Sequence, residues 1–317
     1  MLETFKSRKT IALDCTITLP ACWVGADELE DALRRSHASP HDSGVYSILV
    51  EFPTKCKVMV DAAIRLLSLI NQLDHCAKRV RLAFEEGEAG TMGYLNRMGF
   101  FDHLSRNVEV LPGWPSISGK RRYGGRNASL VEIERIKRDH RDGTLLTRLT
   151  DSLMSTCGDR QDASDLKGAA WTILAELIDN VFSHSRTPLD GYAALQPYSG
   201  GGHVRVAVSD SGLGIMETLR PALKSEFPKL AVLSDLELLV EVFRQGVSRH
   251  GPDRGCGLKG SAAKAIKFKA DLDVRMPTNR VKLVPAHGMY QVNTAYCHDK
   301  LPLIWGTHLC FKISLKT

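Results

Sequence analysis

The stretch "ELIDNVFSHS", Glu176 to Ser185, decides how the second half of the chain is interpreted. Its apolar residues recur at helical spacing. Five residues in and before it can face a core: Trp171, Leu174, Leu177, Ile178 and Val181. Glu176, Asn180 and His184 are four residues apart, so a helix aligns them on another face. A solvated helix face explains any one of them alone, but three in line suit a site.

Two glycines follow an acidic residue further along the chain, in "HVRVAVSDSGLGI". Val204, Val206 and Val208 alternate with polar residues, which predicts a strand that runs into Asp210. Gly212 and Gly214 come next, and glycine lets other atoms approach the backbone closely. A carboxylate held at a strand end in this way can read a ring amine by accepting its hydrogen bond.

Glycines also precede the last predicted helix and the last predicted strand. In "RGCGLKGSAAKAIKF", Gly255, Gly257 and Leu258 lead into a helix, and free N–H groups at a glycine-rich helix start can hold phosphate. In "WGTHLCFKISL", Gly306 and Thr307 open a strand. Each of these patterns is common by itself.

In this order and spacing, the patterns resemble the GHKL superfamily of ATPases and kinases, which includes histidine kinases, gyrase-type topoisomerases, the ninety-kilodalton heat-shock proteins and MutL. The resemblance covers about residues 150 to 317 and all four signature boxes of the superfamily. It implies a Bergerat-type sandwich, a mixed sheet covered by helices, and places the whole chain in the α+β class. ATP and Mg²⁺ are the cofactors that it implies.

The resemblance also implies roles for individual residues. Asn180 matches the asparagine that completes the coordination of Mg²⁺, Glu176 matches the general base of the hydrolysing members, and Asp179 matches the acidic neighbour of that asparagine. Asp210 corresponds to the adenine-reading aspartate. The remaining matches are Gly212 and Gly214 beneath the base, Gly255, Gly257 and Leu258 in the second glycine box, residues 245–254 as a lid over the phosphates, and Thr307 as an aid to adenine recognition through the aspartate and a water.

Three features depart from the commonest pattern or refine it. The second glycine box reads "GCGLKG", so Lys259 replaces a glycine and can alter lid packing or reach a phosphate. The spacing of Glu176, Asn180 and His184 is similar to that of the anti-sigma-factor serine kinases, although a packed or phosphate-near imidazole with no role in proton transfer explains His184 more simply. The sequence contains no Walker A motif, which argues against a P-loop mechanism.

The first third of the chain alternates strand and helix. Residues 46–52 and 79–84 are short β-rich runs, and between them Val60, Ala63 and Ile64 begin a helical spacing, which predicts a parallel βαβ unit. Residues 45–110 loosely resemble a STAS domain, in which only Thr91 is placed as a phosphate acceptor. We therefore expect a STAS-like α/β domain over 1–115, a linker with a polar helix over 116–150, and the ATP-binding domain over 151–317.

Composition narrows the class of protein. The chain has 317 residues, of which 43% are hydrophobic and 25% charged, with a net charge of +6, so nucleic acid is not indicated by charge alone. The basic stretch 119–126, "GKRRYGGR", can touch phosphates but reads more simply as a solvated linker. Eight scattered cysteines predict neither a zinc site nor a disulfide framework. No signal peptide or membrane span is evident, so we expect a cytoplasmic protein without a membrane contact.

Three functions remain open from the sequence. The first is an ATPase whose lid closure changes how the N-terminal domain or a partner is presented, with a protein partner or a homodimer as the expected assembly. The second is a serine/threonine protein kinase in which Glu176 takes the proton of a hydroxyl. The third is a nucleotide-sensing scaffold that binds ATP with little turnover.

Overall fold

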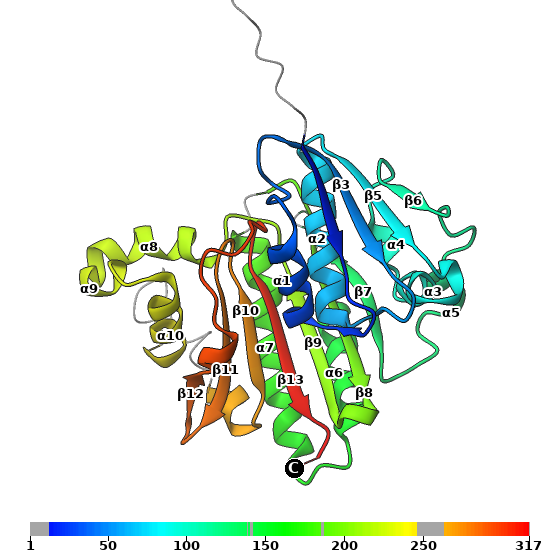
Figure 1. Ribbon diagram of the computed structural model, residues 1–317. Helices are drawn as coiled ribbons and strands as arrows, with labels where there is room; N and C mark the ends of the chain where they lie inside the picture. The colour runs from blue at the N-terminus through cyan, green and yellow to red at the C-terminus, as the bar shows by residue number, and fades with distance from the viewer. Residues whose placement is uncertain (1–12, 138, 140–141, 185–186, 246–262, 317) are drawn as a thin grey trace, which may run out of the picture.

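The structure is a computed structural model that describes residues 13–137, 139, 142–184, 187–245 and 263–316. Two large sheets organise it (Figure 1), and β2 and β4 form a short two-stranded pair beside them. The first is a four-stranded parallel sheet in the order β1-β3-β5-β6. Its strands are β1 (Leu13–Thr18), β3 (Val45–Phe52), β5 (Arg79–Phe84) and β6 (Glu109–Leu111). The helices and short elements of this N-terminal unit are β2 (Trp23–Val24), α1 (Ala26–Arg35), β4 (Lys57–Val58), α2 (Val60–His75), a 3-10 turn (Gly87–Ala89), α3 (Thr91–Arg97), α4 (Phe100–His103) and α5 (Gly119–Tyr123).

The second sheet has seven antiparallel strands in the order β12-β11-β10-β13-β9-β8-β7. They are β7 (Val131–Ile136), β8 (Gly191–Tyr198), β9 (His203–Ser209), β10 (Asp271–Arg275), β11 (Arg280–Ala286), β12 (Met289–Val292) and β13 (His308–Ser314). The other elements of this half are α6 (Leu145–Cys157), α7 (Ala163–His184), α8 (Ile215–Glu226), α9 (Pro228–Ala231), α10 (Asp235–Gln245), 3-10 turns at Ser199–Gly201 and Thr294–Tyr296, and helical residues 263–267.

The predicted βαβ unit is confirmed: β3 and β5 pair in parallel and α2 connects them. The structure differs from the expected helix over part of 116–150, because residues 131–136 form strand β7, which pairs with β8 at the edge of the seven-stranded sheet. Position 151, the expected domain boundary, lies inside α6. The ordered seven-stranded sheet therefore begins before that boundary.

Helix α2 joins the two halves of the molecule. It packs on β5 of the first sheet and on β8, β9 and β13 of the second, and residues from Val60 to Leu73 are buried all round the helix. A helix that is covered on every side belongs to an interior. The apolar core of the N-terminal unit accordingly continues into the second sheet, through Tyr192, Ala194, Ala207 and Cys310.

The opposite face of the seven-stranded sheet packs against α6 and α7 (Figure 1). Successive side chains of a strand point to opposite faces, so Val204, Val206 and Val208 of β9 all enter this second core. The sheet thus lies between α2 on one side and α6 with α7 on the other. Among the described residues, no helix is both long enough and apolar enough to cross a membrane.

Candidate functional site

The polar stripe predicted from "ELIDNVFSHS" lies on α7, which runs as one helix from Ala163 to His184. Glu176 and Asn180 are half-buried and Asp179 is exposed. The side chain of His184 lies outside the described residues.

The core side of α7 corresponds to the prediction with one exception. Leu174, Leu177 and Val181 are buried and Ile178 is partly buried, whereas Trp171 is 45% exposed. Residues follow one another at about 100° around a helix. Trp171, next to Ala170, therefore lies at the edge of the buried stripe, and its side chain reaches solvent.

Asp210 lies immediately after β9, where β9 and β13 meet. Its N–H donates to the carbonyl of Thr307 at 3.0 Å, and the N–H of Thr307 donates to Asp210 Oδ2 at 3.1 Å. Oδ1 accepts from the N–H of Gly212 at 2.7 Å. Burial raises the pKa of Asp210 to about 6, against the lowering effect of these two N–H donors. The carboxylate is therefore ionised at neutral pH, with unused lone pairs for a further donor.

Glycine is required beside Asp210. Gly306 has φ +93°, and a Cβ there would lie 2.1 Å from the carbonyl oxygen of Asp210. Gly214, with φ +83°, caps the start of α8, and a Cβ there would lie 2.9 Å from Cδ of Pro277. Both positions combine a left-handed backbone with a close approach, which only glycine tolerates without displacement.

Thr307 contacts Asp210 through its backbone. Its hydroxyl Oγ1 accepts from the N–H of Ile215 at 3.0 Å and so satisfies one of the free donors at the start of α8. The hydroxyl proton can still be donated elsewhere. Thr307 therefore fixes the Asp210 carboxylate and the start of α8 in one geometry.

Helix α7 reaches the same end of the sheet at Gly191, the first residue of β8. A Cβ on Gly191 would lie 2.5 Å from Cγ1 of Val181 and 3.0 Å from the carbonyl oxygen of Ser209. Val181 directly follows Asn180, and Ser209 directly precedes Asp210. The structure thus brings the C-terminal part of the polar stripe to the strand end that carries Asp210.

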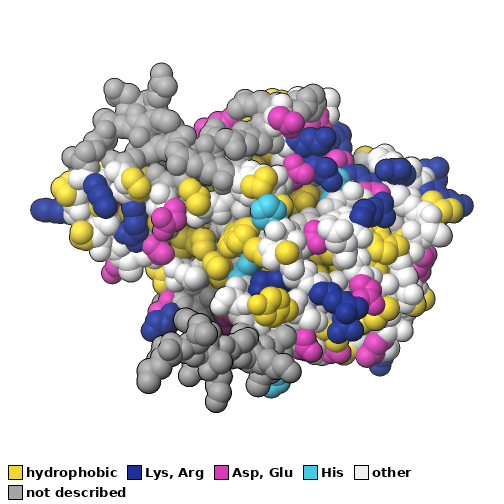
Figure 2. Space-filling model, turned by 90° about the horizontal axis from the view of Figure 1, so that it is seen from above, with side chains coloured by type: hydrophobic (Ala, Val, Ile, Leu, Met, Phe, Trp, Pro, Cys, Tyr) yellow, Lys and Arg dark blue, Asp and Glu magenta, His cyan; other side chains and the backbone are white. Residues whose placement is uncertain are grey.

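The loop after Asp210 leaves an apolar side chain in solvent. Leu213 is 46% exposed. Seen from above, the end of the molecule at which β9 ends shows hydrophobic side chains near the middle of the face (Figure 2). An exposed apolar surface beside a carboxylate is suited to a flat ring that carries an amine.

The second glycine box lies outside the described residues. This applies to Gly255, Gly257, Leu258 and Lys259, and to residues 246–254 of the predicted lid, while Gln245 ends α10. The described residues hold no group of three or more His, Cys, Asp or Glu side chains placed to bind a metal ion. The amide oxygen of Asn180 is an oxygen ligand of the kind that Mg²⁺ accepts together with phosphate oxygens.

Four residues that the sequence motifs did not single out flank the Asp210–Thr307 pair: Ser209, Ser211, Trp305 and His308. The hydroxyls of Ser209 and Ser211 and the backbone N–H of Trp305 bond directly to side chains of α2. His308 is connected to α2 through Ser209. The sequence of α2 contained a signal for these contacts. Asp61, Arg65, Ser68 and Gln72 form a polar stripe at spacings of four, three and four in a helix whose first eleven residues are otherwise apolar.

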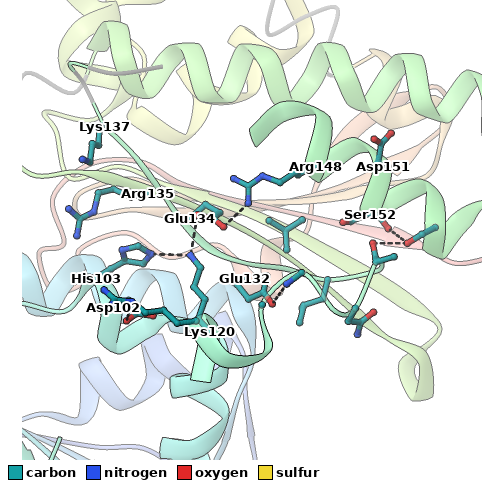
Figure 3. A pocket seen from close by; sticks show the side chains of 18 residues that line it. Asp102, His103, Lys120, Glu132, Glu134, Arg135, Lys137, Arg148, Asp151 and Ser152 are labelled. Carbon is teal, nitrogen blue, oxygen red and sulfur yellow. Dashed lines mark hydrogen bonds and ion pairs between the residues drawn. The ribbon is translucent and has the colours of Figure 1, made fainter. Parts of the chain in front are cut away.

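A separate cleft of about 820 Å³ lies between α6, β7 and the basic stretch 119–126, which forms α5 and the residues after it (Figure 3). Lys120 Nζ donates to the carbonyl of Ile133 at 2.6 Å and pairs with Glu134 at 3.1 Å. Arg148 pairs with the same carboxylate at 2.7 Å. His103 Nε2 also bonds the Ile133 carbonyl, at 2.8 Å. These contacts cap part of the open edge of β7, as sheet edges commonly require.

Comparison with known proteins adds little to this geometry. No protein-family model matches the sequence, and no curated protein shows significant similarity to it. Among solved structures, the B subunit of DNA gyrase from Myxococcus xanthus aligns with 54% of this chain at 13% identity and a TM-score of 0.29. The alignment spans 43% of that gyrase chain, less than half its length. Similarity at this level carries no argument about this chain.

Proposed function

We propose that this protein is a Mg²⁺-dependent ATP-binding protein of the GHKL type that hydrolyses ATP. The observation that carries the proposal is the Asp210–Thr307 pair: an ionised, partly desolvated carboxylate, held at a strand end by two backbone N–H donors, beside close-approach glycines. The helix with Glu176 and Asn180 ends at the same place. Motif order in the sequence and position in the fold point to the same site.

Adenine recognition follows from the hydrogen-bonding capacity of Asp210. Both carboxylate oxygens already accept one N–H, and an ionised carboxylate can accept about four bonds. The exocyclic amine of adenine supplies a donor that the carboxylate can still accept. Leu213 offers apolar surface to the ring, and Gly214 lets the loop after Asp210 pack closely against Pro277.

We propose that side chains of α7 bind the phosphate end of the nucleotide. The Asn180 amide oxygen would hold Mg²⁺, which when bound neutralises charge on the phosphates. Glu176, one helical turn earlier, would orient a water and accept its proton during attack on the γ-phosphate. Asp179 and His184 would adjoin the phosphate site, and Gly255, Gly257, Leu258 and Lys259 would close it from the lid side.

The N-terminal unit would respond to nucleotide state. We propose that lid closure over the phosphates is coupled to this STAS-like unit or to a protein partner, with a homodimer as an alternative assembly. The contacts of α2 with β9 and β13 support the first route, because they connect the unit to both strands of the adenine site.

Nucleotide binding by Asp210→Asn tests the proposal. The substitution keeps the shape of the side chain but directs either an NH2 group or a weaker neutral acceptor at the adenine amine. A charge-assisted hydrogen bond is worth roughly 1.5–3 kcal/mol, so the Kd for Mg-ATP should rise by at least about tenfold in titration calorimetry. Asp151→Asn, an exposed carboxylate of α6 paired with Lys167, is the matched control and should bind as the wild type does. Equal affinity in Asp210→Asn, or no binding by the wild type, contradicts the proposal.

The same protein incubated with γ-labelled ATP separates hydrolysis from phosphate transfer. Label released as free phosphate supports the ATPase. Label on protein supports the kinase alternative, and tight binding with neither product supports the sensing scaffold. We expect free phosphate, because the chemistry assigned to Glu176 needs only water as its second substrate.

A further inference from the structure

We infer that Ser68 and Gln72 of α2 are positioning residues of the adenine site, so that the N-terminal unit supports the site from behind instead of being an appended domain. The inference rests on the proposed nucleotide function and deepens it. Ser68 and Gln72 are one helical turn apart and completely buried. Neither residue touches the position proposed for adenine; each acts through neighbours of Asp210 and Thr307.

Gln72 uses both ends of its amide to hold two segments of the site together. Its Oε1 accepts from the N–H of Trp305 at 2.9 Å, and its Nε2 donates to the carbonyl of the same residue at 3.0 Å. Nε2 also donates to Oγ of Ser211 at 2.9 Å. The Trp305 N–H fixes the amide orientation, because only an oxygen can accept from it.

The fourth partner of the amide comes from the N-terminal unit. His41 Nε2 lies 3.2 Å from Gln72 Oε1, and the His41 ring stacks on Trp305 with centroids 5.0 Å apart. Burial lowers the pKa of His41 to about 4, so the ring is neutral and donates through Nε2–H. The Gln72 amide therefore makes two donated and two accepted bonds, which leaves little freedom for it to move.

Ser68 begins a second chain of hydrogen bonds to the same two segments. Its hydroxyl lies 2.7 Å from Oγ of Ser209, which bonds to Nδ1 of His308. His308 Nε2 lies 3.1 Å from the Trp305 carbonyl, and a carbonyl only accepts, so Nε2 carries the proton. Nδ1 must then accept from Ser209, and Ser209 must accept from Ser68. The direction of every bond in the chain is thereby set.

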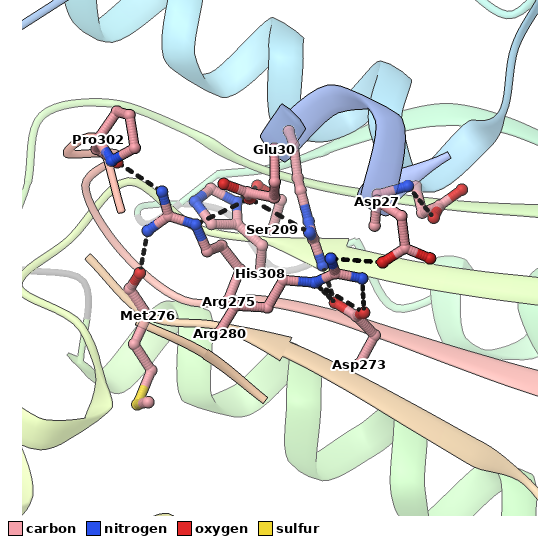
Figure 4. A network of polar contacts seen from close by, with 12 residues as sticks. Asp27, Glu30, Ser209, Asp273, Arg275, Met276, Arg280, Pro302 and His308 are labelled. Atoms are coloured by element: carbon pink, nitrogen blue, oxygen red, sulfur yellow. Dashed lines mark hydrogen bonds and ion pairs between the residues drawn. The ribbon is translucent and has the colours of Figure 1, made fainter. Parts of the chain in front are cut away.

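Ser68 and Gln72 together contact the residues on each side of Asp210 and of Thr307. Figure 4 shows two of these neighbours, Ser209 and His308. Ser209 and Ser211 flank Asp210; Trp305 and His308 lie on either side of Thr307. The Trp305 carbonyl accepts from Gln72 and from His308, so both its lone pairs are used. Contacts from α2 therefore support the direct hydrogen bonds between Asp210 and Thr307 from each side of the pair.

The test compares recognition of the base with binding of the phosphates. ITP carries a carbonyl where ATP carries the exocyclic amine, so only ATP gains from a correctly placed Asp210. We expect Gln72→Glu to disrupt positioning, because the introduced carboxylate keeps the length of the side chain but cannot donate to Trp305 or Ser211. Affinity for Mg-ATP should fall about tenfold, whereas that for Mg-ITP should stay within about threefold of the wild type. The ratio of the affinity for Mg-ATP to that for Mg-ITP, the ATP-to-ITP ratio, should therefore fall severalfold.

Asn71→Asp is the matched control, since Asn71 adjoins Gln72 on α2 and its amide also makes three hydrogen bonds. Its Nδ2 donates to Tyr192 Oη at 2.8 Å and to the His103 carbonyl at 3.0 Å, and its Oδ1 accepts from the Ser105 N–H at 3.0 Å. None of these partners flanks Asp210 or Thr307. The control therefore loses comparable bonds without the predicted loss of the ATP-to-ITP ratio.

Ser68→Ala provides a milder variant, expected to reduce the ratio about threefold, and decides the question if Gln72→Glu does not fold. Thermal unfolding of each variant establishes that it is folded at the titration temperature. The inference is overturned if the folded variants keep the wild-type ratio, or if Asn71→Asp lowers it as much as Gln72→Glu does. Wild-type protein that binds neither nucleotide is a different result, which removes the proposed function itself.

Discussion

The two faces of the seven-stranded sheet bury different kinds of side chain. On the face toward α7, strands β9, β10 and β11 contribute apolar side chains to one core: Val204, Val206, Val208, Leu272, Val274, Val281 and Leu283. On the face toward α1 and α2, the alternate residues of the same strands include Ser209, Asp273, Arg275 and Arg280, which are also buried. One face of the sheet therefore packs apolar side chains, whereas the other, the polar face, combines buried polar and charged groups with apolar residues such as Ala207 and Cys310.

The polar face is held by a charge network between the two halves of the chain (Figure 4). Arg275 Nε pairs with Glu30 of α1 at 2.8 Å, and Arg280 Nη1 pairs with Asp27 at 2.6 Å. Arg65 of α2 and Arg280 both pair with Asp273. These two arginines hold the pKa of Asp273 below its usual range despite burial. The network balances three guanidinium groups with three carboxylates.

The two faces differ in how precisely they determine the arrangement of the elements packed on them. Apolar packing tolerates substitutions that conserve volume, because the hydrophobic effect has no preferred direction. A buried ion network has an optimum at one arrangement, although replacing such networks by apolar residues is often neutral or stabilising in total free energy. We therefore expect the polar face to determine how the N-terminal unit sits on the sheet, and the apolar face to contribute most of the hydrophobic stabilisation.

Removing one charge from the polar face should have the largest effect on stability. Glu30→Ala leaves Arg275 and Arg65 buried without that carboxylate, which typically costs about 3–5 kcal/mol. Leu177→Ala on the opposite face should cost about 2–5 kcal/mol through a lost apolar contact and a cavity. Denaturant unfolding measures both. The exposed Arg79–Glu109 pair gives the control, because Glu109→Ala should cost less than about 1 kcal/mol. A Glu30→Ala cost no larger than that of the control would show that the network is not what holds this face.

Neighbouring residues of β9 permit a finer comparison. Val208 enters the apolar core and Ser209 bonds to Ser68 and His308 on the polar face. Val208→Ala should cost about 1–3 kcal/mol in packing, and Ser209→Ala a similar amount because His308 and Ser68 lose a buried partner. Only Ser209→Ala should also weaken Mg-ATP binding in calorimetry. Equal weakening by both variants would mean that the two faces influence the site alike.

The motifs of the C-terminal half predict local structure well. The helix from Ala163 to His184 and the strand that leads into Asp210 follow directly from hydrophobic periodicity and turn residues. Gly306 and Gly214 have backbones that require glycine, which agrees with their position in the expected glycine turns. Local patterns were sufficient here because each of these features depends on a few adjacent residues.

Packing across the two halves could not be predicted in the same way. Alternation of polar and apolar residues in β9 and β10 is typical of a sheet with one solvated face, and nothing within those strands reveals that α2 covers them. The corresponding signal, the stripe of Asp61, Arg65, Ser68 and Gln72, lies far away in the sequence. A charged edge strand was similarly interpreted as a helix over 131–136, because charges of alternating sign occur in both kinds of element. In both places the structure depends on packing or pairing with segments that are distant in the sequence.

Acid should affect the polar face through His308. Its pKa is lowered well below 6.5, chiefly by burial and also by Arg65 and Arg275. Below pH 6.5 the unfolded chain takes up a proton at this histidine that the folded chain does not, so folding stability is present above that pH and is lost as the pH falls. The slope is at most about 1.4 kcal/mol per pH unit for one proton. Asp210 acts oppositely, since its raised pKa of about 6 makes the folded state bind more protons between about pH 4 and 6.

His308→Asn isolates the histidine contribution, which is the smallest of the expected effects. The variant should be less stable than the wild type at pH 7.5, because asparagine is too short to bond both Ser209 and the Trp305 carbonyl. Between pH 6.5 and 5, however, its free energy of unfolding should fall less steeply with decreasing pH than that of the wild type, since no imidazole remains to be protonated in the unfolded chain. The difference in slope is at most that of one proton, about 1.4 kcal/mol per pH unit. Urea unfolding at half-unit pH intervals measures both quantities. Parallel stability curves for the two proteins would show that His308 takes up its proton in the folded state, and that the polar face accommodates a further positive charge between Arg65 and Arg275.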